Sequence, residues 1–268
     1  MKEIYQEWLQ KAKDQEIYAE LKSIEGDERE IEERFYKHLT FGTGGLRGII
    51  GAGTNRMNVY VIGRITLALA DYLLEKYGSP SVVIAYDSRK KSDVFTRAAA
   101  SALAKRGIKA FLFSELMPTP ILSFAVRYLK ASAGIVITAS HNPKEYNGYK
   151  VYDHTGCQIT TQAADKIWEY ASQHSYFEFD PLSEGKSGEI ACIGQDVVEH
   201  FLLRAGSYCK LGDIGGLKVV YTPLNGTGNK PVRALLERQG FKNVTVVSEQ
   251  ELPDSDFTTC PYPNPEVK

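Results

Sequence analysis

Three polar side chains follow a short apolar run in the middle of the chain. The segment GIVIT (residues 134–138) predicts a buried strand, and Ser140, His141 and Asn142 come directly after it, before Pro143 stops the strand. A strand that needed only burial could end in any turn. A hydroxyl, an imidazole and an amide placed together at a strand end therefore indicate a site for chemistry.

Hydrolysis by a serine and histidine pair is not the expected chemistry. Adjacent residues of an extended chain point to opposite faces, so we do not expect His141 to deprotonate Ser140, and the chain has no G-x-S-x-G elbow. Ser140 could instead carry a phosphoryl group, which adds about −1.5 to −2 charges and needs nearby cations such as Lys144 and Lys150. The other interpretation, a turn held by capping hydrogen bonds, stays open on these residues alone.

The glycine-rich segment FGTGGLRG (residues 41–48) predicts a loop that places flexible backbone beside the guanidinium of Arg47. It is not a dinucleotide fingerprint, because Arg47 occupies a position where G-x-G-x-x-G requires glycine, and the segments at 51–53 and 226–228 fail in the same way. The chain also lacks the full G-x-x-x-x-G-K-[ST] pattern of a P-loop. The loop suits a phosphate or a sugar hydroxyl, and the alternative is a plain turn with a solvated Arg47.

The composition limits the partners. The chain has 268 residues, with 32 Lys and Arg against 33 Asp and Glu, so its net charge of −1 predicts neither nucleic-acid nor acidic-membrane binding. It has no run of 18 apolar residues and no signal-peptide pattern, from which we expect a cytoplasmic protein with no membrane partner. The spacing of the four cysteines predicts free thiols, and Asp254-Ser255-Asp256 predicts a solvated loop rather than a metal site.

The apolar periodicity then gives the elements that must position these side chains. Residues 1–40 predict two or three short amphipathic helices, one of them capped by Asp27. Strands are predicted at 81–86, 108–113 and 134–138, and helices at 58–77 (capped by Asn58), around 95–103 and up to Leu129 (capped by Thr119). This alternation is typical of βαβ units with ligand sites beyond the carboxyl ends of parallel strands, where Ser140 and the YDSR segment with Arg89 both fall.

The second half of the chain adds an antiparallel piece and a repeated plan. Segments 148–152 and 157–160 predict a hairpin turned at 153–156, which makes the sheet mixed. SEGKSGE (183–189) predicts a linker before a helix capped by Asp196. Residues 217–247 then repeat the order strand, polar loop, helix ended by glycine, strand, so we expect one architecture used twice.

Five motifs in this order, FGTGGLRG, YDSR, TASHNPKEYNGYK, PLNGTG and PYPNPE, make the chain resemble the α-D-phosphohexomutase superfamily, in its phosphoglucomutase and phosphomannomutase branch. The resemblance implies an α/β fold with a mixed, mostly parallel sheet flanked by helices, as in the first three domains of phosphoglucomutase. It implies a helical N-terminal extension at 1–40, domain I with the phosphoserine loop at 41–205, and an incomplete domain II at 206–268.

The same resemblance implies a phosphosugar mutase that moves a phosphoryl group between the C1 and C6 hydroxyls of a hexose phosphate through a phosphoserine and a bisphosphorylated sugar. Ser140 would be that phosphoserine, with a phosphoryl oxygen on Mg²⁺. Lys150 and Arg47 would assist proton transfer and stabilise charge, with Lys150 as the proton carrier because an arginine does not lose its proton at neutral pH. His141 is implied as a further catalytic residue that, with Asn142, holds the loop and the phosphoryl oxygens. The supporting residues implied for the phosphoserine loop and the substrate are Asn142, Arg89, Thr43 and Gly44.

The resemblance also implies that parts of the family pattern lie elsewhere. The family's Asp-x-Asp-x-Asp-Arg metal loop should follow PNPE, and no such run occurs before Lys268. We therefore expect an N-terminal fragment with little turnover alone, primed by an activator of the glucose 1,6-bisphosphate type. A mutase for phosphopentose or phosphoglucosamine and a non-catalytic phosphosugar-binding domain remain alternatives, and the sequence predicts neither the preferred sugar nor the oligomeric state.

Overall fold

The computed structural model describes residues 1–180, 189–209, 211–212, 214, 216–261 and 264. Its larger unit is a six-stranded sheet in the order β1-β5-β4-β2-β3-β6. Strands β2, β3, β4 and β6 are parallel, β5 runs antiparallel to β4, and β1 runs antiparallel to β5. This confirms the expected mixed, mostly parallel α/β sheet, formed by β1 (Leu46–Ile49), β2 (Ser81–Tyr86), β3 (Lys109–Phe113), β4 (Ala133–Ile137), β5 (Tyr146–Asp153) and β6 (Ile190–Ile193).

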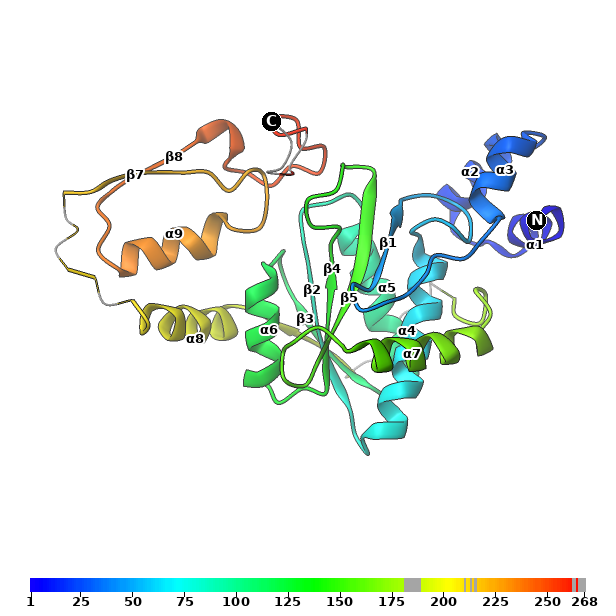
Figure 1. Cartoon of the computed structure of the whole chain (residues 1–268), viewed down its shortest axis with the longest axis horizontal. Coiled ribbons are helices and arrows are strands. Elements are labelled where there is room, and N and C mark those ends of the chain that lie inside the picture. The colour runs from blue at the N-terminus through cyan, green and yellow to red at the C-terminus, as the bar shows by residue number, and fades with distance from the viewer. Residues whose placement is uncertain (181–188, 210, 213, 215, 262–263, 265–268) are drawn as a thin grey trace.

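Helices cover both faces of this sheet (Figure 1). Helices α4 (Val59–Lys76), α5 (Ser92–Lys105) and α7 (Thr161–Gln173) lie on one side, and α6 (Thr119–Tyr128) lies on the other with α8 (Gln195–Gly206) packed against it. Strand β2 shows why two layers are needed, because Val82 and Ile84 belong to one apolar cluster and Val83 and Ala85 to the other. A strand buried on both faces appears in the sequence as the unbroken apolar run that predicts it.

The chain order places two loops at a switch point of the sheet. The chain leaves β2 through α5 to reach β3, and then returns through α6 to β4 on the other side of β2. Right-handed crossovers that move in opposite directions must pass over opposite faces, which agrees with the positions of α5 and α6. The loops that follow β2 and β4 therefore lie next to each other, in the place where open α/β sheets bind their ligands.

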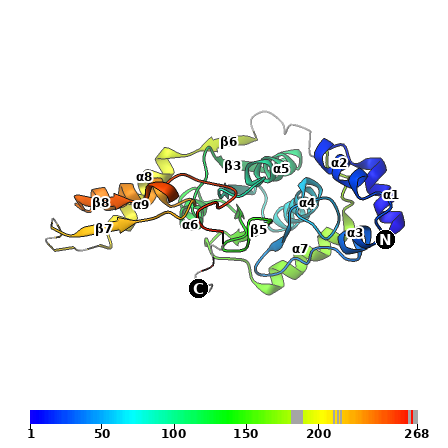
Figure 2. The ribbon, with the colours of Figure 1, turned by 90° about the horizontal axis from the view of Figure 1, so that it is seen from above.

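The first 35 residues contain three helices, α1 (Lys2–Lys11), α2 (Gln15–Ser23) and α3 (Glu28–Phe35), which confirms that the N-terminal segment is helical. Asp27 caps α3 as expected, because its side chain accepts from two backbone amides of the first turn. Trp8 is fully buried and packs edge-on against Tyr60 of α4. The N-terminal helices therefore pack against the start of α4, and Figure 2 shows all three gathered beside it at one end of the molecule.

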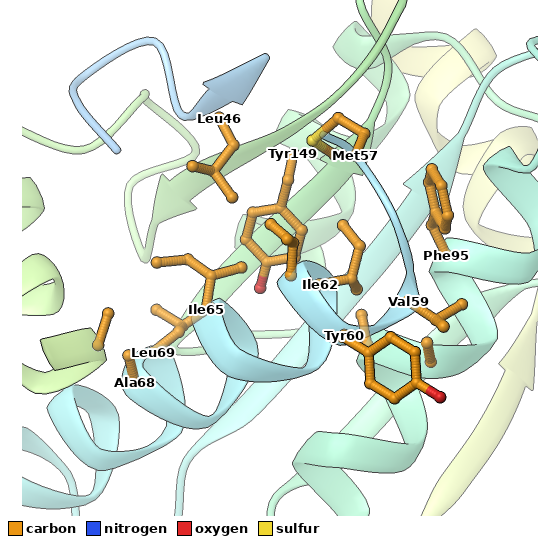
Figure 3. Packing of buried hydrophobic residues seen from close by; sticks show 14 of the residues in the cluster. Leu46, Met57, Val59, Tyr60, Ile62, Ile65, Ala68, Leu69, Phe95 and Tyr149 are labelled. Atoms are coloured by element: carbon orange, nitrogen blue, oxygen red, sulfur yellow. The ribbon is translucent and has the colours of Figure 1, made fainter. Parts of the chain in front are cut away.

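Tyr149 joins the sheet to the α4 layer. Its ring points from β5 onto α4 between Leu46 and Ile62 (Figure 3), and its hydroxyl lies 3.1 Å from the Thr66 hydroxyl. Because side chains alternate along a strand, burying Tyr149 on this face places Lys150 on the opposite face. The core thus fixes the orientation of Lys150, which the sequence analysis predicts as a catalytic residue.

The smaller unit confirms the order strand, helix, strand over residues 217–247. It contains β7 (Lys218–Tyr221), α9 (Asn229–Arg238), β8 (Asn243–Val246) and the short 3₁₀ helix η1 (Ser248–Gln250). Strands β7 and β8 pair in parallel, so α9 is a crossover helix. Gly240, with φ of +87°, follows α9 in the left-handed conformation that the predicted stop requires.

Three strand predictions were wrong or missing. Only residues 42–45 of the predicted glycine loop form a turn, and 46–49 become β1, paired with β5. The predicted hairpin partner, 157–160, makes only a single bridge, between Tyr152 and Gln158, on the part of β5 that lies beyond its pairing with β1. Strand β6 was not predicted, since its four half-exposed residues carry no clear period.

Two caps were also wrong, while a third was right. Gly194, not Asp196, is the N-cap of α8, and Asp196 lies in the first helical turn, where a carboxylate suits the helix dipole. Pro118 precedes α6 as its N-cap, so Thr119 is the first helical residue. Asn58 does cap α4, accepting from two amides of its first turn.

Two further expectations concern the predicted linker and membrane-spanning helices. Residues 183–188 of the predicted linker lie outside the described residues. Among the helices of the described ranges, none is long and apolar enough to cross a membrane.

The pairing of β1, β5 and β4 predicts the effect of a single methyl group. A Cβ at Gly148 would lie 2.6 Å from the Thr138 carbonyl oxygen and 2.8 Å from that of Leu46, so Gly148→Ala should separate the strands and lower the free energy of unfolding by about 1–3 kcal/mol. Gly78→Ala is the control, because nothing lies within 4 Å of its added methyl. Urea unfolding of both variants checks this, and equal losses would contradict it.

Candidate active site

Arg89 lies beneath the loop that joins β4 to β5, with its side chain fully buried. Its Nη1 donates to the carbonyl oxygens of Pro143 (2.8 Å) and Tyr146 (3.1 Å), and its Nη2 to those of Ser140 (2.8 Å) and Asn142 (2.6 Å). Carbonyl oxygens that lose their contact with water need hydrogen-bond donors, and the guanidinium of Arg89 donates to four of them. The conformation of the Ser140 loop therefore depends on a residue from the end of β2.

Asp87 holds Arg89 from the other side. The Arg89 Nε lies 3.5 Å from one oxygen of the Asp87 carboxylate, and the other oxygen accepts from the Arg89 amide (3.0 Å) and the Ser92 hydroxyl (2.8 Å). Burial raises the pKa of the Asp87 carboxyl, and hydrogen bonds from Thr138, the Arg89 amide and Ser92 act in the opposite direction. With this many donors around it, Asp87 serves as a fixed acceptor that orients Arg89.

Ser140 is exposed and lies in a strained turn. Its φ is +58°, in the left-handed region that costs a non-glycine residue roughly 1 kcal/mol, and its amide donates to the Thr138 hydroxyl at 2.9 Å. The expectation that Ser140 and His141 point to opposite faces is wrong, because it assumed an extended chain. Ser140 Oγ and His141 Nδ1 lie 3.4 Å apart, longer than an ordinary hydrogen bond from a hydroxyl. The Ser140 hydroxyl is thus presented to solvent.

Arg47 and Lys150 stand on one face of the sheet. Arg47 pairs with Gly148 across β1 and β5, and Lys150 is two residues further along β5, so their side chains leave the sheet on the same side. Arg47 Nη1 donates to the Asn142 side-chain oxygen at 2.8 Å, which ties β1 to the Ser140 loop. Burial, and then the positive charge of Arg47, lower the pKa of Lys150, so it gives up its proton more readily than a solvated lysine.

Thr43 and Gly44 are exposed at the tip of the turn that precedes β1. The glycine that this turn needs is Gly45, whose φ is +79° and whose added Cβ would lie only 1.9 Å from the carbonyl oxygen of Tyr149. Within the described residues, no hydrogen bond joins Thr43 or Gly44 to Ser140. The structure thus connects Ser140, Asn142, Arg47 and Arg89 in one network and leaves these two at its edge.

Sequence reasoning missed Asn147, which is fully buried between two of these segments. Its side-chain nitrogen donates to the Lys90 carbonyl and the Ser92 hydroxyl, both at 3.0 Å. It thereby ties the start of β5 to the loop after β2. Asn147 lies inside β5. A buried amide in a strand gives no periodic signal, although it belongs to the motif that carries Lys150.

The part of the chain that the structure describes does not supply a metal centre by itself. It contains no group of three or more His, Cys, Asp or Glu side chains that could hold an ion. The carboxylate of Asp87 is occupied by Arg89, and that of Asp256 by Lys90 and Lys144. Asp254, Ser255 and Asp256 lie in a loop, and the Asp256 side chain is 44% exposed. All four cysteines are free thiols, as predicted.

Comparison with known proteins supports the resemblance to the α-D-phosphohexomutase superfamily. Residues 38–177 match the family model for phosphoglucomutase/phosphomannomutase, alpha/beta/alpha domain I, and residues 203–268 match the model for domain II. The chain belongs to the phosphoglucomutase/phosphomannomutase family.

Individual relatives agree with this assignment. A phosphoglucomutase of Staphylococcus haemolyticus is 39% identical over 249 residues, covering 88% of this chain and 44% of the relative. The crystal structure of a candidate phosphomannomutase from Thermus thermophilus superposes with a TM-score of 0.69 at 31% identity, covering 83% of this chain and 48% of the other. A Burkholderia thailandensis protein of the family, at 24% identity and a TM-score of 0.65, covers 81% and 45% and shares the fold. The chain spans about half the length of the curated relatives it matches.

The charges around Lys150 predict how its titration responds to mutation. Its pKa lies below the ordinary value of 10.5, so Arg47→Gln, which removes a like charge, should raise it toward that value. Arg97→Gln, at an exposed position on α5, should leave it unchanged. NMR titration of ¹³C-labelled lysine measures both, and an unchanged or lower pKa in Arg47→Gln would contradict the arrangement.

The lowered pKa of Lys150 also determines how this residue changes the free energy of folding as the pH rises. Between the folded pKa of Lys150 and 10.5 the unfolded chain binds more protons than the folded one, so this residue makes folding more favourable as the pH rises through that window. Below the window its destabilising contribution is fully present, and above the window it vanishes.

Proposed function

We propose that this chain carries the nucleophilic half of a phosphosugar mutase, which moves a phosphoryl group between the C1 and C6 hydroxyls of a hexose phosphate. The observation that supports this most is the presentation of Ser140: an exposed hydroxyl in a left-handed turn, fixed from below by Arg89, with Arg47 hydrogen-bonded to Asn142 of the same loop and Lys150 on the same sheet face as Arg47. A phosphoryl group placed there would meet cations and oriented dipoles, which is what phosphoryl transfer requires of a protein.

In the proposed step, a sugar hydroxyl attacks the phosphorus carried by Ser140. A bond forms between the sugar oxygen and phosphorus, and the bond from phosphorus to Ser140 Oγ breaks, leaving its electron pair on Oγ. The hydroxyl proton passes to the neutral amine of Lys150, whose lowered pKa favours that role. In the return step the other phosphoryl group of the bisphosphate moves to Ser140 Oγ, and Lys150 gives the proton back.

The remaining residues take supporting roles in this proposal. Arg47 keeps its charge and stabilises the phosphoryl oxygens, while its hydrogen bond to Asn142 sets its distance from the loop. His141 and Asn142 contact phosphoryl oxygens from the loop itself. Thr43 and Gly44 are assigned to the substrate side of the site, since they form the exposed turn before Arg47. The division at residues 40 and 205 stays a prediction.

Magnesium and a sugar bisphosphate complete the proposal from outside the described residues. Mg²⁺ neutralises phosphoryl charge when bound, and here Ser140 would offer it only a phosphoryl oxygen, because the described carboxylates form no ligand set. No step above is routed through the metal. An activator of the glucose 1,6-bisphosphate type would prime Ser140. Because the chain spans about half of its relatives, we also propose that its own turnover is low.

Phosphorylation of one serine tests the proposal directly. Incubation of the purified chain with glucose 1,6-bisphosphate should add about 80 Da, the mass of one phosphoryl group, on the peptide that contains Ser140. Ser140→Ala should abolish this gain, whereas Ser172→Ala, at another exposed serine, should keep it. Intact-mass and peptide mass spectrometry measure both.

The outcomes separate the candidate functions. Labelling at Ser140 by a pentose or glucosamine bisphosphate in preference to the glucose compound would move the proposal to another phosphosugar. A chain that binds phosphosugar but is labelled by none of these donors would contradict the mutase proposal and favour a binding domain.

A further inference from the structure

A segment of the smaller unit reaches the Ser140 loop. After β8 the chain returns to the end of the six-stranded sheet where β4 and β5 are joined (Figure 1), and the ring of Phe257 lies against the guanidinium of Arg89, with 5.1 Å between the ring centroid and Cζ. Phe257 is only 6% exposed, unlike most of its neighbours in the segment. The arginine that binds four loop carbonyls in its plane is therefore covered on one face by an aromatic ring from a distant part of the sequence.

The turn that carries Phe257 is built for this presentation. Phe257 has φ of +49°, a left-handed conformation that is costly for a bulky residue. Asp254 holds it by accepting from the amides of Asp256 and Thr258, both at 2.9 Å. Backbone strain that the surroundings hold in place often marks a functional position. The turn aims one ring at Arg89.

Asn225 anchors this turn to the smaller unit. It is buried, its side-chain nitrogen donates to the Leu252 carbonyl (3.0 Å), its side-chain oxygen accepts from the Thr259 hydroxyl (2.7 Å), and its backbone oxygen accepts from the Asp254 amide (3.2 Å). The PLNGTG motif that holds Asn225 therefore supports the Phe257 turn.

Asp256 adds a second contact from the same turn. Its Oδ1 lies 2.7 Å from Lys90 Nζ and 3.2 Å from Lys144 Nζ, so one carboxylate joins the residue after Arg89 to the residue after Pro143. All three side chains are about half exposed, and exposed ion pairs contribute little. A cation and ring pair removed from water is stronger, so Phe257 should be the dominant contact.

We propose that Phe257 is a positioning residue for the Ser140 loop: the turn at 254–258 of the smaller unit holds Arg89, and through Arg89 the loop carbonyls, in the arrangement that presents Ser140. The Phe257 side chain does not contact the reacting atoms. It acts by shielding the Arg89 guanidinium from water and by holding it in place against its four carbonyl acceptors. Only the activity arm of the test rests on the proposed function.

Hydrogen exchange of the loop tests the proposal without any activity. The amides of Asn142 and Tyr146 are protected by hydrogen bonds within the loop, to Ala139 and Pro143. Phe257→Ala should speed exchange of the peptide 139–147 by about tenfold and leave the β3 peptide unchanged. Phe257→Tyr, which keeps the ring, should restore the protection.

Leu252→Ala is the matched control, since this apolar side chain lies in the same segment but is 70% exposed. Loop exchange in Phe257→Ala that matches the parent and Leu252→Ala, in a protein whose β3 peptide stays protected, would overturn the proposal. Equal loss of protection in Phe257→Tyr and Phe257→Ala would also overturn it. An activity measurement completes the test: Phe257→Ala should slow phosphorylation of Ser140 by glucose 1,6-bisphosphate. If the parent chain is not labelled at all, the proposed function is contradicted. The hydrogen-exchange result then decides this inference alone.

Discussion

The site depends on one buried guanidinium that satisfies four carbonyl oxygens. A loop that turns sharply after a buried strand leaves main-chain acceptors without strand partners, and an acceptor left buried and unpaired costs roughly 1–3 kcal/mol. Arg89 meets four of them in the loop from 140 to 146. Because Asp87 and Phe257 fix Arg89 in turn, three segments far apart in sequence set the position of one serine.

The core explains why two charged side chains stand on the same face of the sheet. Tyr149 is buried against α4, and the alternation of β5 then turns Lys150 to the other face, where Arg47 of the neighbouring strand also stands. Two like charges brought together in a half-buried place lower the pKa of the lysine. The same packing that stabilises the sheet therefore lowers the pKa of the side chain that we propose as the proton carrier.

Much of this arrangement could be predicted from the sequence because it depends on local patterns. The strand at 81–86 and the helix after Asn58 follow directly from apolar periodicity, and the ends of β2 and β4 are marked by polar motifs. Strand β1 was not predicted, since glycines hide its pairing with β5. Phe257 could not be found from the sequence, because its contact with Arg89 joins residues 168 positions apart in a segment without period.

The most direct test of the central claim is NMR of the arginine side chains in the intact chain. If Arg89 binds four carbonyl oxygens, its Nη protons should exchange slowly with water and its two NH₂ groups should give separate signals, because rotation about the Nε–Cζ and Cζ–Nη bonds is restrained. Arg97, whose side chain is 64% exposed, provides the reference for a solvated guanidinium. Signals of Arg89 that exchange and average as fast as those of Arg97 would contradict the account.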